Sequence, residues 1–134
     1  MATGKQGLPV LNAMLLQTTL SLTRSISLSK QRTEPNLTTI EANVTDPNCL
    51  NFGLAGVCAL FVDTLSDYSQ PEGTEERLLN SFIDVAAQSN AEYIVLSVLP
   101  EGMPARAYIE KSKAIAYARQ VAKNSNLKPI FVQV

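Results

Sequence analysis

Few residues of this 134-residue chain could carry out chemistry. The chain contains no His, which removes the commonest general base, the commonest zinc ligand and every Ser-His or Cys-His nucleophile pair. The segments LNFGLAG and PEGT lack the glycine spacing and the Lys of a phosphate-binding P-loop. We therefore expect no catalytic residues, no cofactor and no small-molecule substrate, so that the protein is not an enzyme. An enzyme that uses Asp63 with Glu72 or Lys111 is one alternative.

Five acidic residues are grouped between residues 63 and 76, where a predicted strand, a loop and a helix follow one another. Carboxylates are the ligands that Mg²⁺ and Ca²⁺ prefer, but the spacing of these residues matches no calcium-binding loop. Solvated acids, some of them at the start of a helix where the dipole favours negative charge, explain the group more simply. We expect no metal site there, and two thiols without His cannot complete a zinc site either. The acids are Asp63, Asp67, Glu72, Glu75 and Glu76.

Cys49 and Cys58 lie on either side of a predicted loop. Two interpretations stay open. The two residues are either small apolar side chains that remain reduced, or they form a disulfide within one subunit or between subunits.

The charge along the chain is strongly segregated. Residues 1–40 carry four basic residues against one acid, residues 41–102 carry ten acids against one basic residue, and residues 103–134 carry six basic residues against one acid. Chance and helix-dipole preferences can explain this pattern. It also suits self-association, in which basic faces of one subunit meet acidic faces of another.

The first half of the chain predicts strands. Residues 18–30 alternate between apolar side chains and Ser or Thr, which is the period of a strand with a hydroxyl face. Residues 37–44 alternate again after a short polar loop, so we predict an antiparallel hairpin. Residues 45–53 are expected to form a loop and residues 55–65 a third strand. Residues 10–16 could be a short strand or a helical turn.

The second half predicts helices between strands. An amphipathic helix should begin with Thr74 as its N-cap and end near Ser89-Asn90, and a second should run over residues 105–124. Residues 92–99 could be strand or helix, and residues 130–134 should be a strand. We predict one domain over residues 1–134 of the α+β class. Its antiparallel sheet starts with the N-terminal hairpin, and two helices pack on one side of it.

Two binding surfaces follow from these elements. The hydroxyl face of the first strand is either a solvated surface or a surface that meets an RNA backbone, with Arg24, Lys30 and Arg32 as the nucleic-acid-binding charges. The apolar face of the first long helix, with Leu79, Phe82 and Ile83, is the expected contact between copies of the chain. No apolar run is long enough to span a membrane, and the first residues do not form a signal peptide.

The order of landmarks resembles the coat proteins of single-stranded RNA bacteriophages. The segments that carry this resemblance are LSLTRSISLSK, LTTIEANVTDP, the Cys49–Cys58 loop, ALFVDTLSDYS and GTEERLLNSFIDVAAQ. The resemblance implies a virion structural protein that self-assembles through dimers, contacts genomic RNA, and is found in the virion or the host cytoplasm.

The alternative is a small α/β ligand-binding or regulatory module formed by residues 55–134. Its site would lie at the carboxyl ends of the strands, near Asp63-Thr64 or residues 100–106, where such sheets open. Arg106 at a helix start could then hold an anion beside the helix N-terminus.

Overall fold

The computed structural model of the chain describes residues 7–15, 23–27, 37–41, 45–64 and 66–133. The chain divides into two compact units, Met1–Gly53 and Leu54–Val134, which we call the N-terminal unit and the C-terminal unit. The prediction of one domain over residues 1–134 stays a prediction, because two compact units can pack as one domain. No helix in the described residues is long and apolar enough to cross a membrane.

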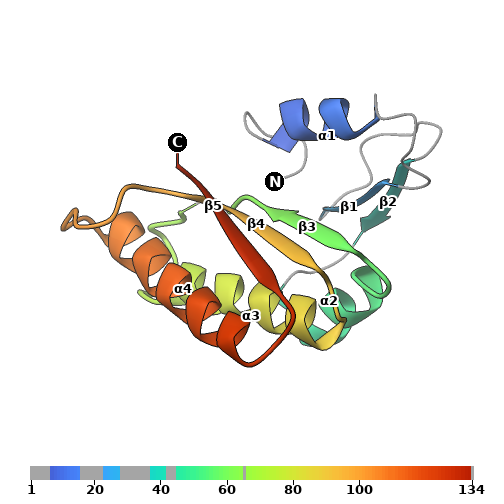
Figure 1. Cartoon of the computed structure of the whole chain (residues 1–134). Helices are drawn as coiled ribbons and strands as arrows, with labels where there is room; N and C mark the ends of the chain where they lie inside the picture. The colour runs from blue at the N-terminus through green and yellow to red at the C-terminus, as the bar shows by residue number, and fades with distance from the viewer. Residues whose placement is uncertain (1–6, 16–22, 28–36, 42–44, 65, 134) are drawn as a thin grey trace. The chain divides into compact units, whose positions relative to one another are not determined.

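The N-terminal unit contains α1 (Gly7–Leu15), β1 (Thr23–Ser27), β2 (Leu37–Glu41) and α2 (Pro47–Gly53) (Figure 1). The strands β1 and β2 are parallel, with Thr23 opposite Leu37 and Ser27 opposite Glu41. The predicted antiparallel hairpin is therefore wrong. Alternation of apolar and polar side chains identifies a strand of either direction, because both directions have a period of two residues. The segment left open between strand and helix, residues 10–16, belongs largely to α1.

The helix α2 replaces the loop predicted over residues 45–53. The Asp46 carboxylate accepts a hydrogen bond from the backbone N–H of Asn48 at 2.9 Å and another from the Cys49 thiol at 3.4 Å. Its backbone carbonyl accepts the N–H of Leu50 at 3.1 Å. An Asp caps the first free N–H groups of a helix, and Pro47 is tolerated at the first helical position because it has no N–H to leave unpaired. The Asp-Pro pair therefore starts a helix here.

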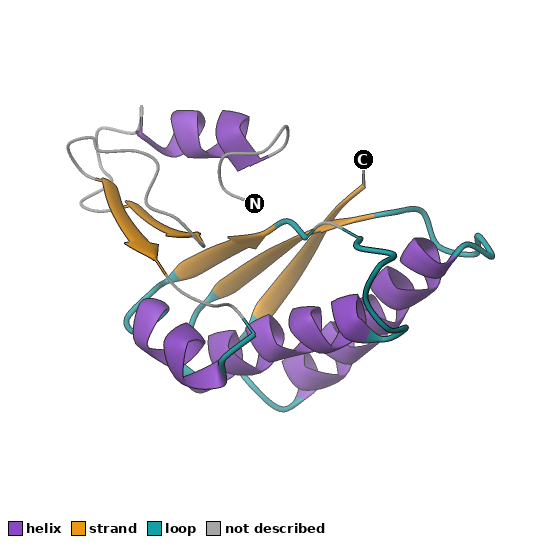
Figure 2. Ribbon diagram, turned by 180° about the vertical axis from the view of Figure 1, so that it is seen from behind, coloured by secondary structure: helices purple, strands orange, loops and turns teal. Residues whose placement is uncertain are grey.

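The C-terminal unit is a three-stranded parallel sheet with two helices. Its strands β3 (Ala59–Val62), β4 (Tyr93–Val98) and β5 (Lys128–Gln133) are ordered β3-β4-β5. The helices α3 (Thr74–Gln88) and α4 (Arg106–Lys123) connect successive strands and lie on the same face of the sheet (Figures 1 and 2). Parallel strands need such crossovers, because the chain must return to the edge where the previous strand began.

This architecture corrects the predicted fold class. The chain is α/β with parallel strands, and the expected α+β fold with an antiparallel sheet is wrong. The bounds predicted for the two long helices are confirmed to within two residues. The open choice for residues 92–99 is settled as a strand, β4.

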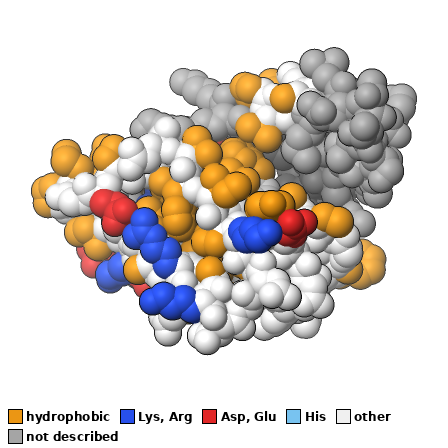
Figure 3. Space-filling view, in the orientation of Figure 1, with side chains coloured by type: hydrophobic (Ala, Val, Ile, Leu, Met, Phe, Trp, Pro, Cys, Tyr) orange, Lys and Arg blue, Asp and Glu red, His pale blue; other side chains and the backbone are white. Residues whose placement is uncertain are grey.

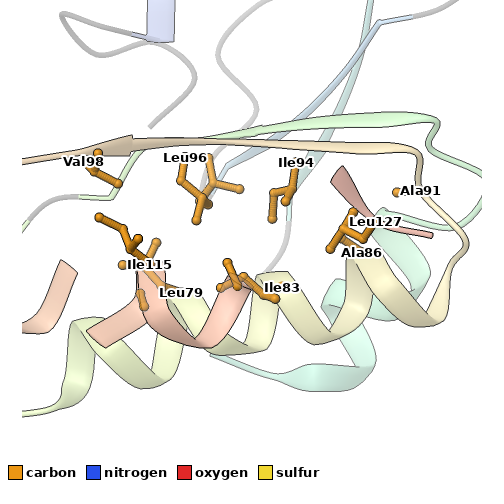
Figure 4. Close-up of a cluster of buried hydrophobic side chains, with 12 residues drawn as sticks. Leu79, Ile83, Ala86, Ala91, Ile94, Leu96, Val98, Ile115 and Leu127 are labelled. Carbon is orange, nitrogen blue, oxygen red and sulfur yellow. The ribbon is translucent and has the colours of Figure 1, made fainter. Parts of the chain in front are cut away.

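The core of the C-terminal unit fills the space between its sheet and its helices (Figure 4). Ile94, Leu96 and Val98 alternate along β4, are at most 2% exposed, and point toward the helices. Burial of apolar side chains of this size is the main source of stability in such a layer. The other members of this core are Val62, Leu79, Ile83, Ala86, Ala91, Ala114, Ile115, Ala118 and Leu127.

The edge strand β5 also presents apolar side chains to solvent. Ile130 and Val132 are 45% and 43% exposed, whereas Phe131 between them packs against the core. Hydrophobic side chains gather on this face in the space-filling view (Figure 3). The alternation shows that the two helices of this unit cover one face of its sheet.

Candidate functional site

Polar and charged side chains meet at the carboxyl edge of the C-terminal sheet. The chain leaves β3 and β4 at this edge, and α3 and α4 begin at the same end of the unit (Figure 1). Open α/β sheets bind ligands at the carboxyl ends of their strands, where loops and helix N-termini converge. A ligand site in this unit is therefore expected at this edge.

Glu110 of α4 caps the N-terminus of α3. Its carboxylate accepts hydrogen bonds from the backbone N–H groups of Gly73 at 3.1 Å, Glu75 at 3.0 Å and Glu76 at 3.2 Å. No side chain of α3 itself provides a cap, so the predicted N-cap role of Thr74 is wrong. Gly73 has a φ of 82°, a left-handed conformation that glycine adopts without a steric cost.

Arg106 joins the same carboxylate to the loop of residues 66–73, which we call the β3–α3 loop. Its Nε donates to Glu110 Oε1 at 2.7 Å, and its Nη2 donates to the backbone carbonyls of Gln70 and Pro71, both at 2.8 Å. The guanidinium also lies over the Tyr68 ring, 5.6 Å from the ring centroid. Arg106 thus binds groups of the same chain. Its Nε–H donates to Glu110, so this N–H is not available to the external anion that the sequence suggested.

The electrostatics of Glu110 follow from these contacts. Its side chain is 6% exposed, and burial raises the pKa of its carboxyl. The hydrogen bonds from Arg106 and from the backbone N–H groups lower the pKa more, so the net pKa lies below the ordinary value. The carboxylate is therefore ionised at neutral pH and balances both the guanidinium and the positive end of the α3 dipole.

A buried ion pair lies beside this cap. Lys111 Nζ is 3.4 Å from Glu75 Oε1, and both side chains are at most 7% exposed. The Glu75 carboxylate also accepts hydrogen bonds from the Thr64 hydroxyl at 2.7 Å and the Ser66 hydroxyl at 2.6 Å, while Lys111 donates to the Thr64 carbonyl at 3.3 Å. A buried charge needs such compensation. The network fixes the segment that follows β3 against α4.

The predicted nucleic-acid-binding residues are only partly described. Arg24 lies in β1, where the structure describes the backbone, and Lys30 and Arg32 lie outside the described residues. Their role as phosphate-binding residues stays a prediction.

The predicted oligomer contact lies mostly in the core of the chain. Leu79 and Ile83 are 1% and 0% exposed, and Phe82 is half-buried against the same core. The apolar stripe packs against the core of the C-terminal unit of the same chain. A contact with a second copy through Phe82 stays a prediction.

Both cysteines are free thiols. Cys49 is half-buried in α2 and Cys58 is exposed just before β3. A disulfide between them stays a prediction. Within the described ranges, no group of three or more His, Cys, Asp or Glu side chains is arranged to hold a metal ion.

The sequence contains a signal that our predictions missed. Gly4 stands three positions before Gly7, the first residue of α1. This is the spacing of the last two glycines in the G-x-G-x-x-G pattern that opens the first helix of dinucleotide-binding folds. A search for P-loops alone passes over it, because the P-loop has a different glycine spacing and requires a Lys.

Comparison with known proteins identifies the fold. No protein-family model matches the chain, and no curated protein matches its sequence. Solved structures do match. A short-chain dehydrogenase/reductase superfamily protein from Agrobacterium tumefaciens with bound NAD has a TM-score of 0.81 at 13% identity, covering 98% of this chain and 46% of that protein.

Two further structures show the same likeness. The dTDP-glucose 4,6-dehydratase of Streptomyces venezuelae with NAD has a TM-score of 0.80 at 13% identity, covering 98% of this chain and 53% of the dehydratase. The triphenylmethane reductase of Citrobacter sp. in complex with NADP(H) has a TM-score of 0.71 at 15% identity, with coverages of 98% and 46%. The chain thus spans about half the length of the structures it matches, and identities this low establish the fold alone.

The likeness corrects several predictions. The chain has the Rossmann-like α/β fold of NAD(P)-binding dehydrogenases and reductases, and the resemblance to RNA bacteriophage coat proteins is wrong. The predictions that depended on that resemblance are therefore wrong as well. They are a virion location, a role in self-assembling capsids and an RNA partner. The exclusion of enzymes and of small-molecule partners is also corrected, because the matched structures are enzymes that bind such molecules. The alternative of a small α/β ligand-binding module fits better.

Proposed function

We propose that the chain is a nicotinamide-dinucleotide-binding module of an oxidoreductase, with a preference for the 2′-phosphorylated form, NADP(H). The observation that carries the proposal is the Gly4-x-x-Gly7 spacing, whose second glycine is the first residue of α1. Support comes from the fold, since the matched structures contain bound NAD or NADP(H).

The glycines and the helix have complementary roles in this proposal. In dinucleotide-binding folds the second glycine of the pattern lets the backbone approach the pyrophosphate, and the third lets the helix pack closely on the strand. We assign these roles to Gly4 and Gly7. The first turn of α1 contains no acidic residue, so no carboxylate of its own competes with a phosphate for the positive end of its dipole.

Arg24 is the proposed determinant of the preference for NADP(H). It lies twenty positions after Gly4, in β1, at the distance where an acid usually binds the 2′-hydroxyl of NAD or an Arg accommodates the 2′-phosphate of NADP. The sequence analysis also predicted that Arg24 contacts a phosphate, but a phosphate of RNA. A single nucleotide phosphate can be bound by one local positive charge, and this is compatible with a chain whose net charge is not positive.

The proposal is tested by titrating the purified chain with NADPH and with NADH, followed by the fluorescence of the reduced nicotinamide. We expect Gly4→Val to lower the affinity for both NADPH and NADH by roughly tenfold or more, because a side chain blocks the approach of the pyrophosphate. Arg24→Ala should lower the affinity for NADPH by about tenfold and leave the affinity for NADH unchanged. Failure of wild-type chain to bind either dinucleotide would refute the proposal.

Arg77→Ala is the matched control. It removes the same charge from an exposed position of α3 in the C-terminal unit and should leave both affinities unchanged. If Arg24→Ala weakened NADH as much as NADPH, Arg24 would not be reading the 2′-phosphate, and that part of the proposal would fail.

A binding or regulatory module without hydride transfer is the second candidate. The cations Arg106 and Lys111 at the carboxyl edge both contact carboxylates of the same chain, which leaves less of their charge for a substrate. Oxidation of NADPH, measured as loss of its near-ultraviolet absorbance with aromatic carbonyl compounds as acceptors, separates the candidates. Binding without turnover would favour the regulatory module.

A further inference from the structure

The β3–α3 loop presents one aromatic ring to solvent in a fixed position. Tyr68 is 64% exposed, and the Arg106 guanidinium covers one of its faces at 5.6 Å from the centroid. A planar ligand would therefore stack on the opposite face of the ring. Loops are usually more mobile than the helices and strands they connect, so an exposed ring on a loop keeps one position only where contacts hold the loop.

Hydrogen bonds within the loop and from α4 hold the backbone beneath the ring. Asp67 accepts the backbone N–H and the hydroxyl of Ser69 at 2.9 and 2.6 Å, and its carbonyl accepts the N–H of Gln70 at 3.1 Å. Arg106 then binds the carbonyls of Gln70 and Pro71, both at 2.8 Å. The residue that covers the ring thus also fixes the loop that carries it. Such an arrangement reduces the ordering cost that a ligand would otherwise meet.

The surroundings of the ring indicate the chemistry of its ligand. Two apolar side chains close to Arg106 in the sequence are also exposed, Met103 in the loop before α4 at 51% and Ile109 in its first turn at 43%. A cationic ligand stacked on Tyr68 would be repelled by Arg106 on the other side of the ring. An anionic ligand would be repelled by the carboxylates of the same loop, Asp67 and Glu72. An uncharged planar ring avoids both repulsions and gains stacking on Tyr68.

We propose that Tyr68 is a stacking platform for an uncharged planar aromatic ring of a small molecule, at the carboxyl edge where α/β folds bind their ligands. The platform is built by residues of the C-terminal unit alone. Its assignment as a substrate subsite rests on the proposed function, because an oxidoreductase binds a second, non-nucleotide ligand besides its dinucleotide.

The test uses the full chain labelled with 3-fluorotyrosine and 2-naphthol as the probe. The chain has four Tyr, so fluorine NMR gives four signals, each assigned by a Tyr→Phe variant. We expect the Tyr68 signal to shift to saturation during the titration. Tyr93 is the matched control, since it also carries a cation over its ring, Lys128 at 5.2 Å, but begins β4 at the opposite edge of the sheet. Its signal should not move.

Variants then separate stacking from other causes. Tyr68→Ala should weaken 2-naphthol by about fivefold, whereas Tyr68→Phe, which keeps the ring, should bind as the wild type does. An unmoved Tyr68 signal, or equal shifts of Tyr68 and Tyr93, would overturn the proposal. NADPH is titrated on the same sample: 2-naphthol bound at Tyr68 without NADPH binding supports the platform and refutes only the proposed function.

Discussion

The carboxylate of Glu110 accepts the backbone N–H of Glu75 at 3.0 Å, so that one helix of the C-terminal unit provides the N-terminal cap of the other. The contact joins residues far apart in the chain and fixes α3 and α4 at the edge of the sheet where they both begin. Its consequences for stability can be measured.

Replacing Glu110 by Gln should lower the free energy of unfolding by about 2 kcal/mol, because a neutral amide accepts the three N–H groups less strongly and leaves the Arg106 charge unpaired. Urea unfolding followed by circular dichroism measures this change. Glu101→Gln is the control, since Glu101 is 52% exposed and its contact with Arg119 is 3.8 Å long. A loss no larger than that of the control would contradict the capping role.

The same carboxylate should make stability depend on pH. The folded-state pKa of Glu110 lies below the ordinary 4.5, so the folded state binds this proton more weakly than the unfolded chain does. The stabilisation is therefore fully present above the unfolded-state pKa and is lost as the pH falls through the lower folded-state value. Unfolding free energies measured from neutral pH down to below pH 4.5 should fall more steeply for the wild type than for Glu110→Gln. Parallel curves would assign the acid sensitivity to other groups.

Replacing only one side chain of the buried Lys111–Glu75 pair should lower the free energy of unfolding more than replacing both. Lys111→Met leaves the Glu75 carboxylate buried with two hydroxyl donors, and we expect a loss of about 3–5 kcal/mol. Adding Glu75→Gln to that variant should recover part of the loss, which a double-mutant cycle by urea unfolding would show. Lys113→Met is the comparison, because its Nζ lies 3.6 Å from Glu76 on the surface and should contribute below about 0.5 kcal/mol. Strictly additive losses would mean that Lys111 and Glu75 do not stabilise each other.

The hydroxyl of Tyr117 donates to the Asp84 carboxylate at 2.6 Å, between α4 and α3. This hydrogen bond, together with burial, raises the pKa of Tyr117 above 10.0. Stabilisation from the contact is therefore present below the unfolded-state pKa and is lost as the pH rises through the higher folded-state value. Tyr117→Phe should lower stability by about 1 kcal/mol at neutral pH. The difference from wild type should vanish in strongly alkaline solution, and a difference that persists there would have another cause.

Substitutions of Ile83 test whether it belongs to the core or to a contact between copies. Ile83→Ala should lower the free energy of unfolding by about 2–5 kcal/mol and Ile83→Val by about 0.5–1.5 kcal/mol, as expected for a side chain that is 0% exposed. Neither loss should depend on protein concentration. Ile109→Ala, at a 43% exposed position of α4, provides the control. Losses that grow on dilution would point to an interface between copies.

The two helices of the C-terminal unit could be predicted from the sequence, because apolar spacing reports which side of an element is buried. The central strand β4 could not, since a short apolar run suits a buried strand or a buried helix. Strand direction could not, since the same alternation suits both directions and the β1–β2 pair was assigned the wrong one. Asp46 was taken as a turn residue, although an Asp before a Pro is also a helix start.

The polar part of the candidate site could not be predicted either. A search for an apolar stripe on α4 passes over Glu110 and Lys111, which are 4% and 5% exposed. Their partners, Gly73 and Thr64, come from distant parts of the sequence, and only the fold brings them together. The Gly4-x-x-Gly7 signal, by contrast, was present in the sequence and was missed because only the P-loop spacing was considered.

The position of β4 in the middle of the three-stranded sheet has a consequence for how the C-terminal unit is made. β3 and β5 pair with β4 and not with each other. On the ribosome, β3 and α3 therefore emerge before Tyr93–Val98, the strand with which β3 pairs in the described part of the chain, and β5 joins β4 last of the three strands. We expect the apolar side chains of β3 to be exposed to chaperones and to aggregation during that interval. Slowing translation after Val98 should give the β3–β4 pair time to form before β5 arrives.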